Sequence, residues 1–142
     1  LVPAEGGTPR QLTSGDFGAS ELAQTLDYEW APDGRSIVLD GLRESDADYR
    51  YRESYLYVLD VASGAVRQLV TTKGIWANPA VSPDGRTVAF VGREYGTQSY
   101  RANEVWVVAI DGSGLRALTT YDRDPGSLRM EPRWQRRLLF LG

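Results

Sequence analysis

The residues of this 142-residue chain that could support chemistry are carboxylates and hydroxyls, because it contains no histidine and no cysteine. Without those two residue types, neither a Ser-His-Asp or Cys-His catalytic set nor the usual zinc sites can be assembled. The sequence also has no Gly-x-Ser-x-Gly nucleophile motif and no phosphate-binding glycine loop. We therefore predict that the chain has no catalytic residues, no metal site and no cofactor.

Two pairs of closely spaced aspartates are the remaining candidates for metal ligands. Asp46 and Asp48 form one pair, and Asp122 and Asp124 form the other. Neither pair has the spacing and the fixed glycine of a calcium-binding loop. We interpret both pairs as solvated charges in loops.

Charge and hydropathy exclude two classes of partner. The chain has 16 basic and 19 acidic residues, so its formal net charge is −3 and it lacks the positive field that nucleic acid or an anionic membrane attracts. Its longest apolar run, Val105 to Ile110, is far shorter than the roughly 20 residues of a membrane-spanning helix. We therefore expect no nucleic-acid partner and no membrane partner. The absence of cysteine fits either a cytoplasmic or a periplasmic protein, so the compartment stays open.

An internal repeat is the strongest signal in the sequence. Residues 29–39 read EWAPDGRSIVL and residues 80–90 read AVSPDGRTVAF. Pro-Asp-Gly has the chemistry of a hairpin turn, because proline presets φ, aspartate tolerates the bridge region and glycine enters the left-handed region. Each copy therefore predicts two strands joined by a tight turn.

The repeat continues in step after this hairpin. Residues 55–60 align with residues 104–109, and both runs lead through a glycine-containing turn into a short strand that begins with arginine. No stretch has an uninterrupted helical period, so we predict four strands for each repeat. The predicted units are the end of one blade at 1–14, two complete blades at 26–72 and 76–120, and the start of another blade at 128–142.

Repeats of about 50 residues with four strands and short turns are typical of β-propeller blades. We therefore predict an all-β fold with two complete four-stranded antiparallel blades and partial blades at both ends. After Trp134 the Pro-Asp-Gly turn is missing, so the last hairpin is expected to turn within about two residues.

The motifs WAPDGRSIVL, VSPDGRTVAF and DGSGLRALT resemble the TolB-like, WD40-like propeller repeat. The same repeat builds the N-terminal propellers of prolyl-oligopeptidase-family serine peptidases of the dipeptidyl and acylaminoacyl peptidase type. That resemblance implies a non-catalytic propeller that gates and contacts a peptide substrate beside an α/β-hydrolase domain. The alternative is a TolB-like scaffold that binds proteins and has no enzymatic activity.

The repeat also predicts which surface could bind a partner. The turns at one end of each blade are minimal, whereas the loops at the other end are long and rich in aromatic and charged residues, a composition suited to peptide or protein contacts. The recurring Tyr-Arg pairs at 51–52 and 100–101 favour a structural role over direct contact. The candidate partner residues are Arg43, Glu44, Tyr49, Tyr51, Arg52, Trp76, Glu94, Tyr95, Tyr100 and Arg101.

Two whole blades with partial ends are fewer than the four to eight of a closed propeller. The sequence therefore predicts open strand edges, which pair with other chains. We expect self-association through these edges unless the chain is part of a longer parent. The N-terminus shows neither the basic start nor the apolar segment of a secretory signal.

The missing histidine and cysteine predict that the purified chain does not hydrolyse peptide or ester substrates. A fluorogenic peptidase and esterase panel measures this directly. Turnover that survives removal of contaminating enzymes and disappears when one serine of this chain is replaced by alanine would contradict the prediction.

Overall fold

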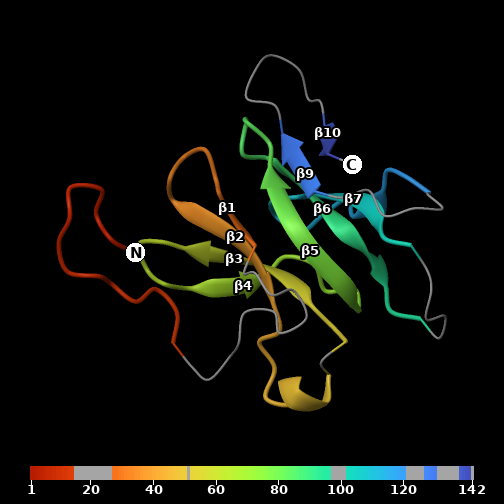
Figure 1. Cartoon of the computed structure of the whole chain (residues 1–142), viewed down its shortest axis with the longest axis horizontal. Coiled ribbons are helices and arrows are strands. Elements are labelled where there is room, and N and C mark those ends of the chain that lie inside the picture. The colour runs from red at the N-terminus through yellow and green to blue at the C-terminus, as the bar shows by residue number, and fades with distance from the viewer. Residues whose placement is uncertain (15–26, 51, 97–101, 121–126, 131–137, 142) are drawn as a thin grey trace.

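Two four-stranded antiparallel sheets dominate the structure (Figure 1). The structure is a computed structural model, and it describes residues 1–14, 27–50, 52–96, 102–120, 127–130 and 138–141. A third sheet has two strands. This architecture confirms the predicted all-β fold. The first sheet contains β1 (Tyr28–Trp30), β2 (Ser36–Gly41), β3 (Tyr55–Asp60) and β4 (Val66–Gln68), the second β5 (Gly74–Val81), β6 (Thr87–Glu94), β7 (Glu104–Ala109) and β8 (Arg116–Ala117), and the third β9 (Ser127–Met130) and β10 (Leu138–Leu141).

Each Pro-Asp-Gly turn is stabilised by its own aspartate. Asp33 Oδ1 accepts a hydrogen bond from the Arg35 backbone N–H at 2.9 Å, and Asp84 Oδ1 accepts one from the Arg86 backbone N–H at 3.0 Å. The glycine after each aspartate has a φ of 66° or 71°, in the left-handed region that glycine enters without steric cost. These turns join β1 to β2 and β5 to β6, as the sequence predicts.

Serine and aspartate stabilise the turns between the third and fourth strands. Asp60 Oδ1 accepts hydrogen bonds from the backbone N–H and the hydroxyl of Ser63, and Asp111 Oδ1 accepts the same two from Ser113. These hydrogen bonds lower the pKa of both aspartates. Both turns are therefore determined locally by the sequence.

The hydrophobic core lies between the two four-stranded sheets. Trp76 in β5 is 0% exposed and packs edge-on against Phe90, with ring centroids 5.4 Å apart, and against Trp106 at 5.1 Å. Its indole N–H donates to the Thr72 carbonyl at 2.9 Å. Val38 and Leu56 of the first sheet belong to the same core cluster. Burial of this cluster holds the two sheets together.

The second sheet is apolar on its other face as well. Ala89 and Val91, which alternate with core residues along β6, form a separate buried cluster with Ala80, Val105 and Val107. β9 packs against β5 and β6 on the side of the second sheet away from the first. The third sheet thus occupies the place of the next blade (Figure 1).

The N-terminal segment 1–14 forms no strand, although the repeat aligns it with a fourth strand. It folds back on itself, since the Leu1 amino group donates to the Arg10 carbonyl and the Arg10 N–H donates to the Leu1 carbonyl, each at 2.8 Å. The structure gives strand bounds, while the division of the chain into units at 1–14, 26–72, 76–120 and 128–142 stays a prediction.

The last hairpin is described only in its two strands. β9 ends at Met130, which pairs with Leu138 of β10. The tight turn predicted after Trp134 lies outside the described residues and stays a prediction. No helix in the described part of the chain is long and apolar enough to cross a membrane.

We predict that Gly92→Ala destabilises the protein by at least about 2 kcal/mol, because an alanine Cβ would lie 2.0 Å from the Ile75 carbonyl oxygen and 2.7 Å from the Trp76 ring. Neither the backbone nor a buried ring can move away without disrupting β5. Urea denaturation measures the change. The matched control is Gly96→Ala, whose Cβ would meet no atom within 4 Å, and an equal loss in both variants would contradict the prediction.

Candidate functional site

Loops gather at one end of the two main sheets, as the repeat predicts. The loop between β2 and β3 includes a short 3-10 helix, η1 (Ala47–Tyr49), which lies at the lower edge of Figure 1, away from the β1–β2 turn. This loop meets the connection between β4 and β5 and the end of β6. We call residues 42–54, 69–73 and 94–96 together the loop face.

Glu53 organises the loop face. Its buried carboxylate accepts hydrogen bonds from Arg50 Nη2 at 2.6 Å and from the Tyr55 hydroxyl at 3.0 Å, and it forms an ion pair with Lys73 Nζ at 2.8 Å. Burial raises the pKa of Glu53, but the hydrogen bonds from Arg50, Lys73 and Tyr55 outweigh it, so the pKa lies below its ordinary value. The carboxylate is therefore ionised at neutral pH and holds both cations in place.

Further contacts tie the first sheet to the second beneath this carboxylate. The Ser54 backbone N–H donates to the Gly74 carbonyl at 3.1 Å, and the Ser54 hydroxyl donates to the Trp76 carbonyl at 2.8 Å. Lys73 Nζ lies 4.5 Å from the centroid of the Tyr95 ring, within the range of a cation–π contact. The three segments of the loop face are thus mutually anchored.

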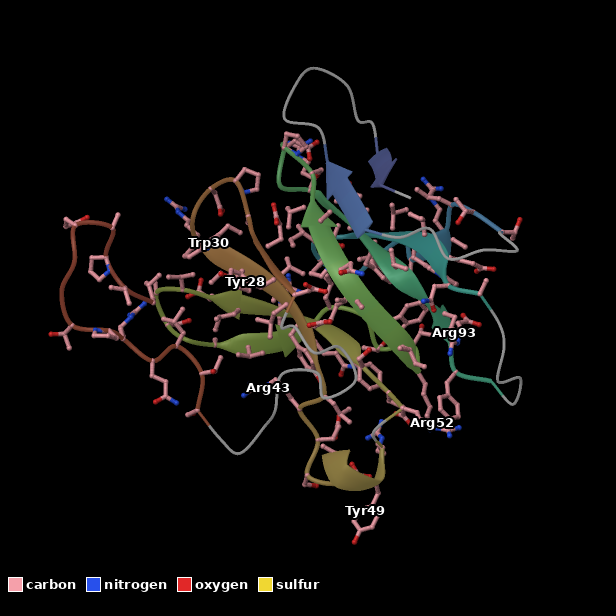
Figure 2. All side chains as sticks on the ribbon, in the orientation of Figure 1. Tyr28, Trp30, Arg43, Tyr49, Arg52 and Arg93 are labelled. Carbon is pink, nitrogen blue, oxygen red and sulfur yellow. The ribbon has the colours of Figure 1, made fainter. Side chains whose placement is uncertain are left out.

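The structure places the predicted partner residues in different settings. Tyr49 is 89% exposed and projects from the tip of η1 (Figure 2), and Arg52, Glu94 and Tyr95 are also exposed. Glu44 pairs with Arg50 at 3.8 Å. These residues lie on the loop face, and their function as a binding surface stays a prediction.

Arg43 belongs to the base of the loop face. Its guanidinium donates to the Ser14 carbonyl at 3.2 Å, and its backbone N–H donates to the Tyr57 hydroxyl at 3.1 Å. The prediction that Trp76 belongs to the partner surface is wrong, because the side chain is completely buried between the sheets. Tyr51, Tyr100 and Arg101 lie outside the described residues.

Sequence reasoning missed the residues that order the loop face, namely Arg50, Glu53 and Lys73. The ion pairs of Arg50 with Asp46 at 3.4 Å and with Glu53 are local, at i,i+4 and i,i+3 spacing, and could have been proposed from the sequence. The contact with Lys73 joins two blades and has no counterpart in the repeat. In the described residues no group of three or more histidine, cysteine, aspartate or glutamate side chains could hold a metal ion.

Asp40 is a second buried acid that the sequence analysis overlooked. It is 0% exposed, its Oδ1 accepts the Asp27 backbone N–H at 3.3 Å, and its Oδ2 has no hydrogen-bond partner among the described residues. Burial, with a smaller contribution from the charge of Asp27, raises the pKa of Asp40 to about 7. The corresponding residue of the second blade is the apolar Val91. An aspartate at this repeat position is therefore unusual, and the sequence alone could have drawn attention to it.

We predict that Asp40→Asn makes the protein more stable than wild type at pH 8 and that this advantage disappears near pH 4. The unfolded carboxyl ionises near pH 3.8 and the folded one near pH 7, so wild-type stability falls as pH rises between these values. The asparagine amide does not ionise, so the variant avoids a loss of unfolding free energy on the order of 2 to 4 kcal/mol.

Urea denaturation from pH 4 to 8.5 provides the measurement. Glu5→Gln, at an exposed position, is the control, and its free energy of unfolding should vary with pH as that of wild type does. A stability difference between Asp40→Asn and wild type that does not vary with pH would contradict the raised pKa.

Known proteins resemble this chain in sequence. The chain is 30% identical over 119 residues to an uncharacterized protein of Agrobacterium fabrum, covering 84% of the chain and 34% of that protein. It is 31% identical over 115 residues to the Tol-Pal system protein TolB of Anaeromyxobacter dehalogenans, covering 81% and 23% respectively. The chain thus spans about a third or less of these relatives. No family model matches it.

Solved structures agree with these relatives. TolB from Acinetobacter baumannii superposes with a TM-score of 0.65 at 18% identity, covering 92% of this chain and 28% of that one. A provisionally assigned TolB from Agrobacterium tumefaciens gives 0.61 at 27% identity, covering 90% and 38%. The AtxE2 isopeptidase gives 0.54 at 15% identity, covering 72% and 18%. Together, the strand order, the repeat and these likenesses show that the chain has a TolB-like β-propeller fold.

Proposed function

We propose that this chain is part of a TolB-like propeller that binds another protein through its loop face and has no catalytic activity of its own. The observation that carries the proposal is an exposed aromatic side chain on an anchored loop. Tyr49 stands on η1, which the Arg50–Glu53–Lys73 network holds against both blades. A tyrosine presented in this way binds at a low cost in conformational entropy.

The chemistry around Tyr49 suits a protein surface better than a small ligand. The loop face carries the exposed ring of Tyr95 and charges of both signs, including Arg52 and Glu94. Mixed charges around aromatic anchors are typical of protein interfaces, where the charges fix orientation and the rings provide contact area. Figure 2 shows that Tyr49 projects away from the sheets, whereas Arg52 lies closer to them.

The comparisons support a binding role. The TolB relative of Anaeromyxobacter dehalogenans is named as a protein of the Tol-Pal system. A protein-binding propeller agrees with membership of a protein system and with a chain that lacks histidine and cysteine. We place the partner on the loop face because the turns that the structure describes at the opposite end, between β1 and β2, β3 and β4, β5 and β6, and β7 and β8, are tight.

The second candidate is the propeller of a prolyl-oligopeptidase-like serine peptidase, with its hydrolase domain outside these residues. The likeness to the AtxE2 isopeptidase concerns the fold alone at that level of identity. A gene that encodes these residues together with a Gly-x-Ser-x-Gly motif followed by aspartate and histidine would favour this candidate.

A photo-cross-linking amino acid at position 49 tests the proposed surface in the cells that make the protein. We expect a discrete cross-linked adduct with one protein, because Tyr49 would lie inside the interface. The matched control carries the same amino acid at position 86, in the exposed turn between β5 and β6 at the other end of the blade.

Purified protein with Tyr49→Ser should bind the cross-linked partner at least about tenfold more weakly than wild type, as expected for an interface anchor. The same adducts at positions 49 and 86, or unchanged binding by Tyr49→Ser, would contradict the loop face as the binding surface.

A further inference from the structure

Asp40 is an acidic residue in the interface between the two complete blades. It lies two residues after Val38 on the same face of β2, and it pairs with Leu56 of β3. Val38 and Leu56 belong to the buried cluster that joins the blades. β2 and β3 pack against β5 of the second blade, and we call this contact the blade joint. The carboxyl of Asp40 therefore lies in the blade joint, where it is fully buried.

The three strands that pack against β2, namely β1, β3 and β5, provide no cation for Asp40. β5 has no ionisable side chain, and the ionisable side chains of β1 and β3 are acidic residues and tyrosines. Glu29 and Asp60 share the face of Asp40, because they pair with Val38 and Ser36 of that face. The tyrosines lie on alternate positions and point to other faces of these strands. The charges that the strands add to this face are thus negative.

Asp27 is the charged residue that acts directly on Asp40. The Asp27 backbone N–H donates to Asp40 Oδ1 at 3.3 Å, and the Asp40 backbone N–H donates to the Asp27 carbonyl at 3.2 Å. The negative charge of the Asp27 side chain opposes ionisation of Asp40. Oδ2 of Asp40 has no hydrogen-bond partner among the described residues. An ionised Asp40 would therefore be an uncompensated charge in the blade joint.

A cation of the first blade also faces the second blade, but it has a partner of its own. The guanidinium of Arg67 in β4 donates a hydrogen bond to the Ile110 carbonyl, in the turn between β7 and β8. Arg10, at the same position of its repeat, donates in the same way to the Val61 carbonyl. This contact therefore belongs to the repeat and does not neutralise Asp40.

The contacts that anchor the loop face cross the blade joint close to Asp40. Ser54 lies two residues before the β3 partner of Asp40, and its hydroxyl donates to the Trp76 carbonyl of β5 at 2.8 Å. One residue earlier, the Glu53 carboxylate pairs with Lys73 at 2.8 Å. Separation of β2 and β3 from β5 would break these contacts. The state of the blade joint thus determines whether the loop face is held.

We propose that Asp40 makes the blade joint sensitive to pH: the joint is closed when the carboxyl is protonated, and ionisation opens it locally and releases the loop face. Opening hydrates the carboxylate, which the closed joint cannot do, and it leaves the strand pairing within each blade intact. The pKa of Asp40, raised to about 7 by burial and by Asp27, agrees with this arrangement. The inference concerns the joint itself and does not rest on the proposed function.

Amide hydrogen exchange of the full 142-residue chain, followed by NMR from pH 5 to 8, measures the opening. The backbone N–H groups of Ser54 and Trp76 donate to carbonyls across the joint, so their protection from exchange reports its closure. We expect this protection to fall at least about tenfold between pH 5 and 7 and to level off above pH 7. The reason is that the Asp40 carboxyl ionises near pH 3.8 once hydrated and near pH 7 in the closed joint.

A low concentration of urea separates local opening from global unfolding. Exchange through a local opening exposes little surface and depends weakly on urea, whereas exchange through global unfolding depends strongly on it. We expect the Ser54 and Trp76 amides to be at least about tenfold less protected at pH 8 than the amides that join β6 to β7, and to respond weakly to urea.

Variants assign the pH dependence to Asp40. Asp40→Asn and Asp40→Val, the latter with the residue of the second blade, should make the protection of Ser54 and Trp76 independent of pH from 5 to 8. Asp27→Asn should move the levelling-off to lower pH, because a charge that raises the pKa of Asp40 is removed. Glu29→Gln, an exposed acid of the same face, is the matched control and should leave the wild-type profile unchanged.

Three results would overturn the proposal. The first is a protection of Ser54 and Trp76 that stays constant between pH 5 and 7 in the wild-type protein. The second is exchange of these amides only through global unfolding, with the protection and the urea dependence of the β6–β7 amides. The third is an unchanged pH profile in both Asp40→Asn and Asp40→Val.

Discussion

The structure depends on a blade that is apolar on both faces. In β6, alternate residues enter separate clusters: Val88 and Phe90 pack toward the first blade, while Ala89 and Val91 lie on the other face. A sheet of this kind is stable only when both faces are covered, so each blade requires a neighbour on each side. Val81 is buried against the first blade, whereas Trp30, at the same repeat position, is 39% exposed on β1.

The need for a neighbour also explains how the loop face is built. Glu53 comes from the first blade and Lys73 from the connection to the second, so their ion pair exists only once the blades have packed together. The buried carboxylate has both cations and a tyrosine hydroxyl as partners, which offsets its cost of desolvation. Contacts between the blades and contacts within its own loop therefore both determine the position of Tyr49.

Features with local causes could be predicted from the sequence. The Pro-Asp-Gly turns, the strands beside them and the serine–aspartate turns follow from neighbouring residues, and the structure reproduces them. Features that depend on packing between the blades could not be predicted from the sequence. The repeat places Trp76 at the end of a loop and so predicts an exposed side chain, but packing buries it in the core. Asp40 occupies a repeat position that is apolar in the second blade, where the corresponding residue is Val91, and its burial follows from packing.

The arginine contact between blades also has a direction. The guanidinium of Arg67 in β4 of the first blade donates a hydrogen bond to the Ile110 carbonyl in the turn between β7 and β8 of the second blade, so the donor belongs to the earlier blade and the acceptor to the later one. Such an interface is heterologous, so a linear stack of any length leaves one unused donor and one unused acceptor, and only a ring satisfies every pair. Blades joined by this contact cannot assemble in reversed order. The packing of consecutive repeats thus has a polarity that each pair of neighbours shows in the same sense, from the arginine of one repeat to the turn of the next.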